Sequence, residues 1–327
     1  MSKPLTSPLG LALLGSLVFT GCQAGEDPGA SLSEAELRAA IPTVEQLSIT
    51  LPDGASSAAR ATAEGVDDPS QLRQMTYNLA TGANQTVRDV LTMIDNITDH
   101  PSVAVDEDTR RWGPYTAQGS DVTQVFFMEL QEDGDLGYSL RWKVADDPDP
   151  TFTEVVSGVI TEAQGLYKNH GAFEIDYDAA ASIDPTVDAH GLARYEYDTA
   201  SVDREVRAHF DGVFDAEGQA IDAHLVYVDL GDDGGELGFA FQTDFAGDDG
   251  ILEDAALHSR WQVGGVGRSD ATITHGTLTD DVVNVSECWG QDALLDYRAW
   301  WLNGAAMGDE GDGALCAYDQ GEFPGQP

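Results

Sequence analysis

The clearest pattern in the chain is a run of apolar side chains at steps of three or four between residues 72 and 97. At 3.6 residues per turn, these positions fall on one face of a helix. Asp68 and Pro69 are typical of a helix start, and the run stops before Pro101. The pattern therefore predicts a long amphipathic helix packed against a sheet. Its apolar positions are Leu72, Met75, Leu79, Ala83, Val87, Val90, Ile94 and Ile97.

From Val103 onward the apolar positions recur at every second residue, as between Tyr138 and Val144, which is the period of a half-buried strand. Acidic turns containing glycine separate these runs and leave no room for crossover helices, so neighbouring strands should pair antiparallel. The predicted fold class is α+β, mainly β: a long antiparallel meander that curls into a strongly curved sheet or barrel. The strands are predicted near 122–130, 138–144, 153–163, 172–178, 193–199, 204–214, 220–229, 237–245, 256–263 and 270–275.

The start of the chain has the features of an export signal. Lys3 is followed by an apolar stretch from Pro8 to Phe19, which is too short to span a bilayer. The sequence Phe19-Thr20-Gly21-Cys22 resembles the bacterial lipobox, in which small residues precede a cysteine that takes the diacylglycerol. The resemblance implies a lipoprotein signal peptide at 1–21 and lipidation of Cys22. An ordinary secretory signal with a chance cysteine is the alternative.

The anchored protein should sit on a membrane through its acyl chains without crossing it. Gln23, in place of Asp after the cysteine, favours the outer membrane, on its periplasmic or surface face. Residues 22–66 are predicted to form a lipidated tether with a short helix, opened by a capping box at Ser33 and Glu36, and a linker. Residues 67–327 are predicted to form a single helix-plus-antiparallel-β domain with a C-terminal disulfide tail.

The cysteine count is odd, and acylation of Cys22 would leave Cys288 and Cys316 as one pair in an oxidising compartment. The tail also contains a Cys288-Trp289 pair, Tyr297, and a loop containing glycine that leads to Cys316. This ending resembles that of uncharacterised lipoproteins from myxobacteria and their relatives. That group has no established activity, so the resemblance implies none.

The charge of the chain is strongly negative, with 58 Asp and Glu against 16 Lys and Arg, a formal net charge of −42. Such a surface repels nucleic acid and anionic headgroups, so nucleic acid is excluded as a partner. The bias resembles that of proteins from salt-loving or marine bacteria, in which ions screen the self-repulsion. Calcium binding and simple solubility are the alternative explanations.

Two sets of side chains are candidate metal ligands. A tight hairpin at residues 215–218 would place two imidazoles and two carboxylates on one face, a donor set that suits zinc. A bulged turn would instead slip the register by one residue and separate the histidines. This set comprises His209, Asp211, Asp222 and His224. Calcium is the candidate ion for two acidic clusters: Asp146, Asp147 and Asp149, and Asp244, Asp248, Asp249 and Glu253.

Catalytic motifs with recognisable spacing are missing from the sequence, and no cofactor is predicted. We therefore expect a membrane-anchored, exported, non-catalytic structural or interaction module. The alternative is a carrier that holds a lipid or another apolar ligand in a half-barrel under the long helix. A calcium- or zinc-dependent binding module is a weaker alternative. The candidate ligand contacts of the carrier are Trp142, Phe239 and Phe241.

Overall fold

The computed structural model describes residues 33–52, 68–163, 166–214, 220–244, 250–321 and 323–324. The predicted signal peptide, Cys22 and most of the predicted linker therefore lie outside the described residues. Asp248 and Asp249 of the second acidic cluster also lie outside them.

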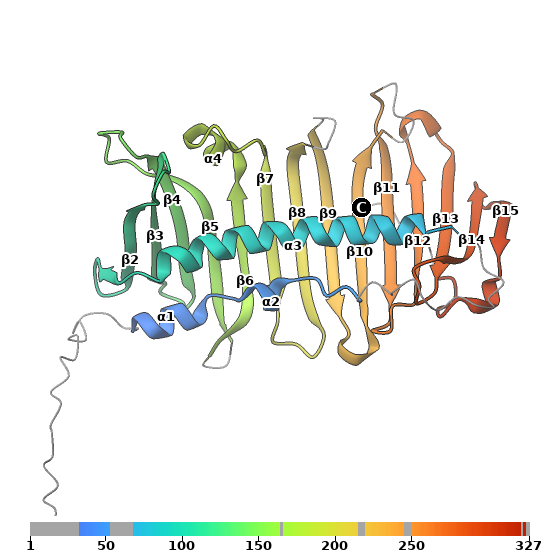
Figure 1. The fold of residues 1–327 in the computed structure, drawn as a ribbon, viewed down its shortest axis with the longest axis horizontal. Helices are drawn as coiled ribbons and strands as arrows, with labels where there is room; N and C mark the ends of the chain where they lie inside the picture. Colours follow the sequence, from blue (N-terminus) through green and yellow to red (C-terminus); the bar gives the residue numbers. More distant parts are fainter. Residues whose placement is uncertain are drawn as a thin grey trace, which may run out of the picture.

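The strands of the described residues form one sheet in which every strand pairs antiparallel with its neighbour in the sequence (Figure 1). This confirms the predicted antiparallel meander. The strands are β1 (Ser102–Ala104), β2 (Thr109–Thr116), β3 (Val122–Leu130), β4 (Leu136–Val144), β5 (Thr153–Ala163), β6 (Leu166–Asp176), β7 (Leu192–Asp198), β8 (Arg204–Phe214), β9 (Ala220–Asp229), β10 (Gly235–Thr243), β11 (Glu253–Trp261), β12 (Gly267–Thr274), β13 (Val282–Trp289), β14 (Leu295–Leu302) and β15 (Ala305–Gly311).

Four α-helices and three short 3₁₀ turns complete the described part of the chain. They are α1 (Glu34–Ala40), α2 (Val44–Leu47), α3 (Gln71–Thr98), α4 (Tyr177–Ile183), η1 (Gly231–Asp233), η2 (Gly276–Leu278) and η3 (Gly313–Leu315). The predicted capping box of α1 is present. The long helix begins two residues later than predicted, with Ser70 as N-cap, because Asp68 and Pro69 pair with the loop before β14 instead.

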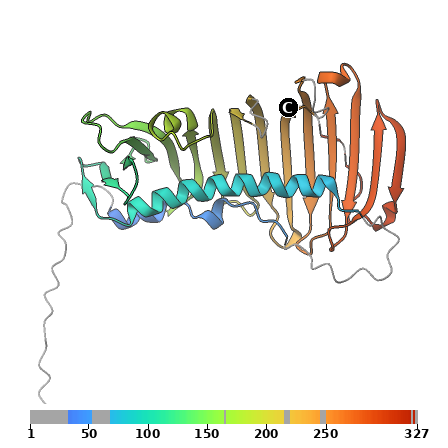
Figure 2. The same ribbon diagram turned by 45° about the horizontal axis from the view of Figure 1, so that its top comes forward.

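Helix α3 crosses one face of the sheet, with its N-terminus over β11–β13 and its C-terminus over β2 and β3 (Figures 1 and 2). Its 28 residues span about 42 Å at about 1.5 Å per residue. The nine spacings from β3 to β12 span about 43 Å at about 4.8 Å each. Because the two lengths agree, the sheet does not wrap around the helix between these strands.

The predicted barrel is wrong, since β1 and β15 are the two ends of the described sheet and do not pair with each other. Strong curvature is not supported either. A straight helix that spans the width from β3 to β12 covers the apolar face there, so these strands can bury it without curling onto one another. The long helix that the sequence predicts thus covers the apolar face that a closed barrel would otherwise have enclosed.

We call the face under α3 the inner face and the opposite one the outer face. Large apolar side chains such as Phe126, Met128 and Leu140 are fully buried on the inner face. The segment from α1 to residue 52 lies beside α3 on this same face: Asn84 of α3 exchanges two hydrogen bonds with the backbone of Ile49, at 2.6 and 2.9 Å. Part of the predicted tether therefore belongs to the core, while the boundary at residue 66 stays a prediction.

Candidate ligand-binding cavity

A cavity of about 380 Å³ lies between the middle of α3 and the inner face at β4–β6, where α4 closes one side. Its wall is mostly apolar, with polar side chains contributed by α3 and the start of α4. The lining residues are Gly82, Gln85, Thr86, Asp89, Val90 and Met93 from α3, Trp142, Val155, Val156 and Ile175 from the sheet, and Tyr177, Ala180 and Val187 from α4 and the loop after it.

Trp142 is the largest side chain of this wall, and only 8% of it is exposed. Its indole N–H finds no hydrogen-bond acceptor among the described residues. A buried donor without an acceptor costs about 1–3 kcal/mol. That N–H is itself buried, so a ligand in the cavity would touch the indole ring rather than the N–H.

The polar residues of the cavity come from one turn of α3 and from Tyr177. Gln85 donates to the Asp89 carboxylate at 2.7 Å, and both side chains are exposed. Burial raises the pKa of Tyr177, and the Asp89 carboxylate raises it further, whereas the Thr86 hydroxyl opposes the shift. The Tyr177 phenol therefore stays protonated at neutral pH and serves as a hydrogen-bonding group.

Two local features of the sequence open this space. Asp176 caps α4 by accepting from the backbone N–H of Ala179 at 2.8 Å, which turns the chain out of β6 and carries Ala180 over the cavity. Gly82 leaves an opening in the α3 wall, because a Cβ added there would meet nothing within 4 Å. Gly82 of α3 and Ala180 of α4 thus both border the cavity.

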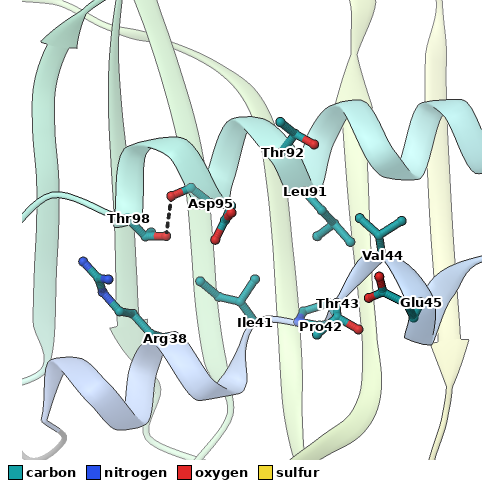
Figure 3. Close-up of a pocket in the computed structure, with 10 residues that line it drawn as sticks. All are labelled: Arg38, Ile41, Pro42, Thr43, Val44, Glu45, Leu91, Thr92, Asp95 and Thr98. Carbon is teal, nitrogen blue, oxygen red and sulfur yellow. Dashed lines mark hydrogen bonds between the residues drawn. The ribbon is translucent and has the colours of Figure 1, made fainter.

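A second cavity of about 350 Å³ lies between the α1–α2 segment and the C-terminal half of α3 (Figure 3). Ile41, Val44 and Leu91 line it together with the charged side chains of Arg38 and Asp95. This mixture of charged and apolar groups suits an apolar ligand less well than the wall around Trp142 does.

The structure does not bring the three predicted ligand contacts together. Trp142 lines the first cavity, whereas Phe239 and Phe241 lie on β10 with ring centroids 5.0 Å apart. Strands β4 and β10 are six positions apart in the sheet, which is about 29 Å at the usual spacing. Phe239 is a core residue, only 8% exposed.

The cavity residues on α4 and the loop after it were missed, because the periodicity places residues 177 and 178 at the end of a strand at 172–178. The signal was present: Asp176 is followed by alanines at 179–181, a typical helix start after an N-cap residue. Val155 and Val156 are both buried because a bulge near Leu140 interrupts the alternation, and such an irregularity leaves little trace in sequence periodicity.

The four predicted zinc ligands are only partly assembled. His209 lies opposite His224, with ring centroids 3.9 Å apart. Asp222 instead accepts from the backbone N–H of Gly212 at 3.0 Å. Within the described ranges, no group of three or more His, Cys, Asp or Glu side chains is arranged to hold a metal ion.

The first acidic cluster is organised by a lysine. The Lys143 ammonium donates to the backbone carbonyls of Asp147 and Asp149, at 3.0 and 3.2 Å. Hydrogen bonds from Thr151 lower the pKa of Asp149. In the second cluster, the Asp244 carboxylate accepts a hydrogen bond from the backbone N–H of Gly250. The Glu253 carboxylate is buried and accepts instead from the backbone N–H of Thr277.

The predicted disulfide is present between Cys288 on β13 and Cys316 after η3. It holds the C-terminal segment on the outer face over β11–β13. There the backbone carbonyls of Tyr318 and Asp319 accept from Arg268 and Arg260. The tail thus covers a buried ion pair between Arg268 and Asp270.

Comparison with protein-family models, with curated proteins and with solved structures finds no match to this chain. In the part of the chain that the structure describes, no helix combines the length and the apolar character needed to cross a membrane.

Proposed function

We propose that this chain is an exported, membrane-anchored protein that binds a small apolar ligand in the cavity between α3 and β4–β6, without catalysis. The observation that carries the proposal is the cavity itself. Its volume of about 380 Å³ lies within the range of about 300–1,000 Å³ that is usual for ligand sites, and its wall is apolar with a few polar groups at one side.

The lining side chains are suited to binding rather than to chemistry. Asp89 and Tyr177 are the titratable groups of the wall, and Asp89 is exposed. Val156, Ile175 and Met93 offer contact area and no reactive group. The Gln85 side chain, the Thr86 hydroxyl and the Tyr177 phenol are the neutral polar groups of the wall. The ligand that fits best has an apolar body and a polar group at one end.

The ligand is neutral rather than anionic in this proposal. The protein has a net charge of −42 and a carboxylate, Asp89, beside the cavity, and both repel an anion. Lipidation of Cys22, which the lipobox resemblance implies, would hold the domain at a membrane, where apolar molecules collect. The proposed function is therefore that of a lipid-anchored carrier or receptor for a neutral apolar molecule.

Gly82 provides a test that does not disturb the core. A phenylalanine in its place should extend from the α3 wall into the opening, while an alanine should leave the opening nearly unchanged. Both substitutions favour the helix by roughly 0.3–1 kcal/mol, so neither should unfold the protein. Binding is measured with N-phenyl-1-naphthylamine, a neutral apolar probe whose fluorescence rises in apolar surroundings.

We expect saturable probe binding by the wild-type protein and by Gly82→Ala, and a loss of binding in Gly82→Phe. Thermal unfolding of each variant checks that the fold is intact. Equal binding by all three proteins, or no saturable binding by any, would contradict the proposal. The latter result would leave the structural or interaction module as the better description.

A further inference from the structure

A second site lies on the outer face, away from the cavity. His209 of β8 and His224 of β9 are direct cross-strand partners, with ring centroids 3.9 Å apart and ring planes at 88°. Both side chains are exposed. On the inner face, the neighbouring Ala208 and Leu225 are buried, so the strands that carry the two imidazoles are fixed by core packing.

A β-bulge keeps the histidines together. Near the turn, Phe214 pairs with Ala220, which is the slipped register expected to separate the two imidazoles. The register shifts again between Phe210 and Val213, where Gly212 has a φ of +64° that favours glycine. This second shift returns His209 to a position opposite His224.

The bulge also fixes a carboxylate beside the pair. The Gly212 backbone N–H donates to the Asp222 carboxylate at 3.0 Å. Asp222 lies two residues before His224 on the same face of β9, and its charge acts on the imidazole. The two imidazoles and the Asp222 carboxylate therefore lie close together on the exposed outer face of β8 and β9.

We propose that His209 and His224 together bind one divalent ion of the zinc and copper class on the outer face. Imidazole nitrogen is a preferred donor for these ions, whereas calcium and magnesium prefer oxygen. Water completes the coordination, so the site is open and exchangeable rather than structural. The strongly negative surface raises the local concentration of divalent cations around it.

The number of nitrogen donors is the property to measure. One equivalent of Cu²⁺ is added to the protein at 0.15 M salt, and electron paramagnetic resonance reports the nitrogens bound to copper. We expect two imidazole nitrogens in the wild-type protein and one in each of His209→Gln and His224→Gln. Calorimetric titration with Zn²⁺ should show a saturable site that both substitutions abolish, while Mg²⁺ should give none.

His258→Gln is the matched control, because His258 lies on the outer face of β11 next to Glu236 and has no histidine partner across the strand. It should leave the copper spectrum and the zinc titration unchanged. Both target histidines are exposed, so melting temperature should not change. Spectra and titrations that are the same in the wild-type protein and in both single variants would show that the metal binds elsewhere, and would overturn the proposal.

Discussion

Glu287 on β13 accepts a hydrogen bond of 2.9 Å from the backbone N–H of Leu72 in the first turn of α3. The same carboxylate accepts from the Ser70 hydroxyl at 2.7 Å and pairs with Arg298, and only 1% of Glu287 is exposed. The first N–H groups of a helix lack internal partners, and the helix dipole favours a negative charge there. Glu287 therefore fixes the start of α3 to a strand 215 positions later in the chain.

We predict that Glu287→Ala destabilises the protein by about 3–5 kcal/mol, because it leaves Arg298 and the helix start without their buried partner. Urea unfolding followed by circular dichroism measures the loss. Glu310→Ala is the control, since Glu310 also pairs with Arg298 but its side chain is 37% exposed. It should cost no more than about 1 kcal/mol. Equal losses of unfolding free energy in the two variants would show that the buried contact of Glu287 with the start of α3 adds no stability.

The bond between Cys288 and Cys316 closes a loop of 28 residues. By loop-closure entropy, its removal should cost about 3–4 kcal/mol. We predict this loss for the Cys288→Ser/Cys316→Ser double variant in urea unfolding. In the unreduced, denatured wild-type protein, neither Cys288 nor Cys316 should react with a thiol-labelling reagent. Full labelling of either cysteine would mean that the tail is held by packing and by Arg260 and Arg268 alone.

Local patterns predicted much of the fold. The bounds of β3, β5, β8 and β9 agree with the predicted runs, and in the middle of β8 and β9 buried and exposed side chains alternate. The last strands, β13–β15, were missed, since β13 and β14 carry polar and apolar side chains that are buried on both faces. Ser286 and Glu287 are adjacent and both buried, the first under the tail and the second under α3.

The cavity could not be predicted from the sequence, since it is formed by elements that are distant in the chain. Trp142 was identified as an aromatic on a covered face, but Val187 and Met93 join it only through the placement of α4 and α3. Similarly, the contact between His209 and His224 depends on two register shifts that cancel. The histidine spacing alone was compatible with either face.

The net charge of −42 should make stability depend on ionic strength. Monovalent salt screens repulsion without saturating, whereas a calcium site would stabilise the fold by a saturable amount. We predict that melting temperature rises gradually with sodium chloride up to molar concentrations. At fixed ionic strength, micromolar calcium should have little effect. A sharp calcium-dependent rise that is lost in Asp248→Asn/Asp249→Asn would instead identify a calcium-dependent module.

Membrane anchoring is tested at Cys22, which lies outside the described residues. If the lipobox resemblance holds, Cys22→Ser prevents acylation, so the exported protein should leave the membrane fraction and accumulate as an uncleaved precursor. Fractionation and the mass of the mature N-terminus measure both effects. Retention of the variant in the membrane fraction through its N-terminus would argue against a lipid anchor.

The most direct test of the central claim is whether a neutral apolar ligand comes within contact distance of Trp142. A brominated fatty acid methyl ester quenches tryptophan at close range, and the chain has six tryptophans. The comparison is between the wild-type protein and Trp142→Phe, which keeps an aromatic ring in the cavity wall. Saturable quenching in the wild-type protein that is largely lost in Trp142→Phe is the predicted result. Quenching of the same size in both proteins, or none in the wild-type protein, would contradict the assignment of this cavity as the ligand site.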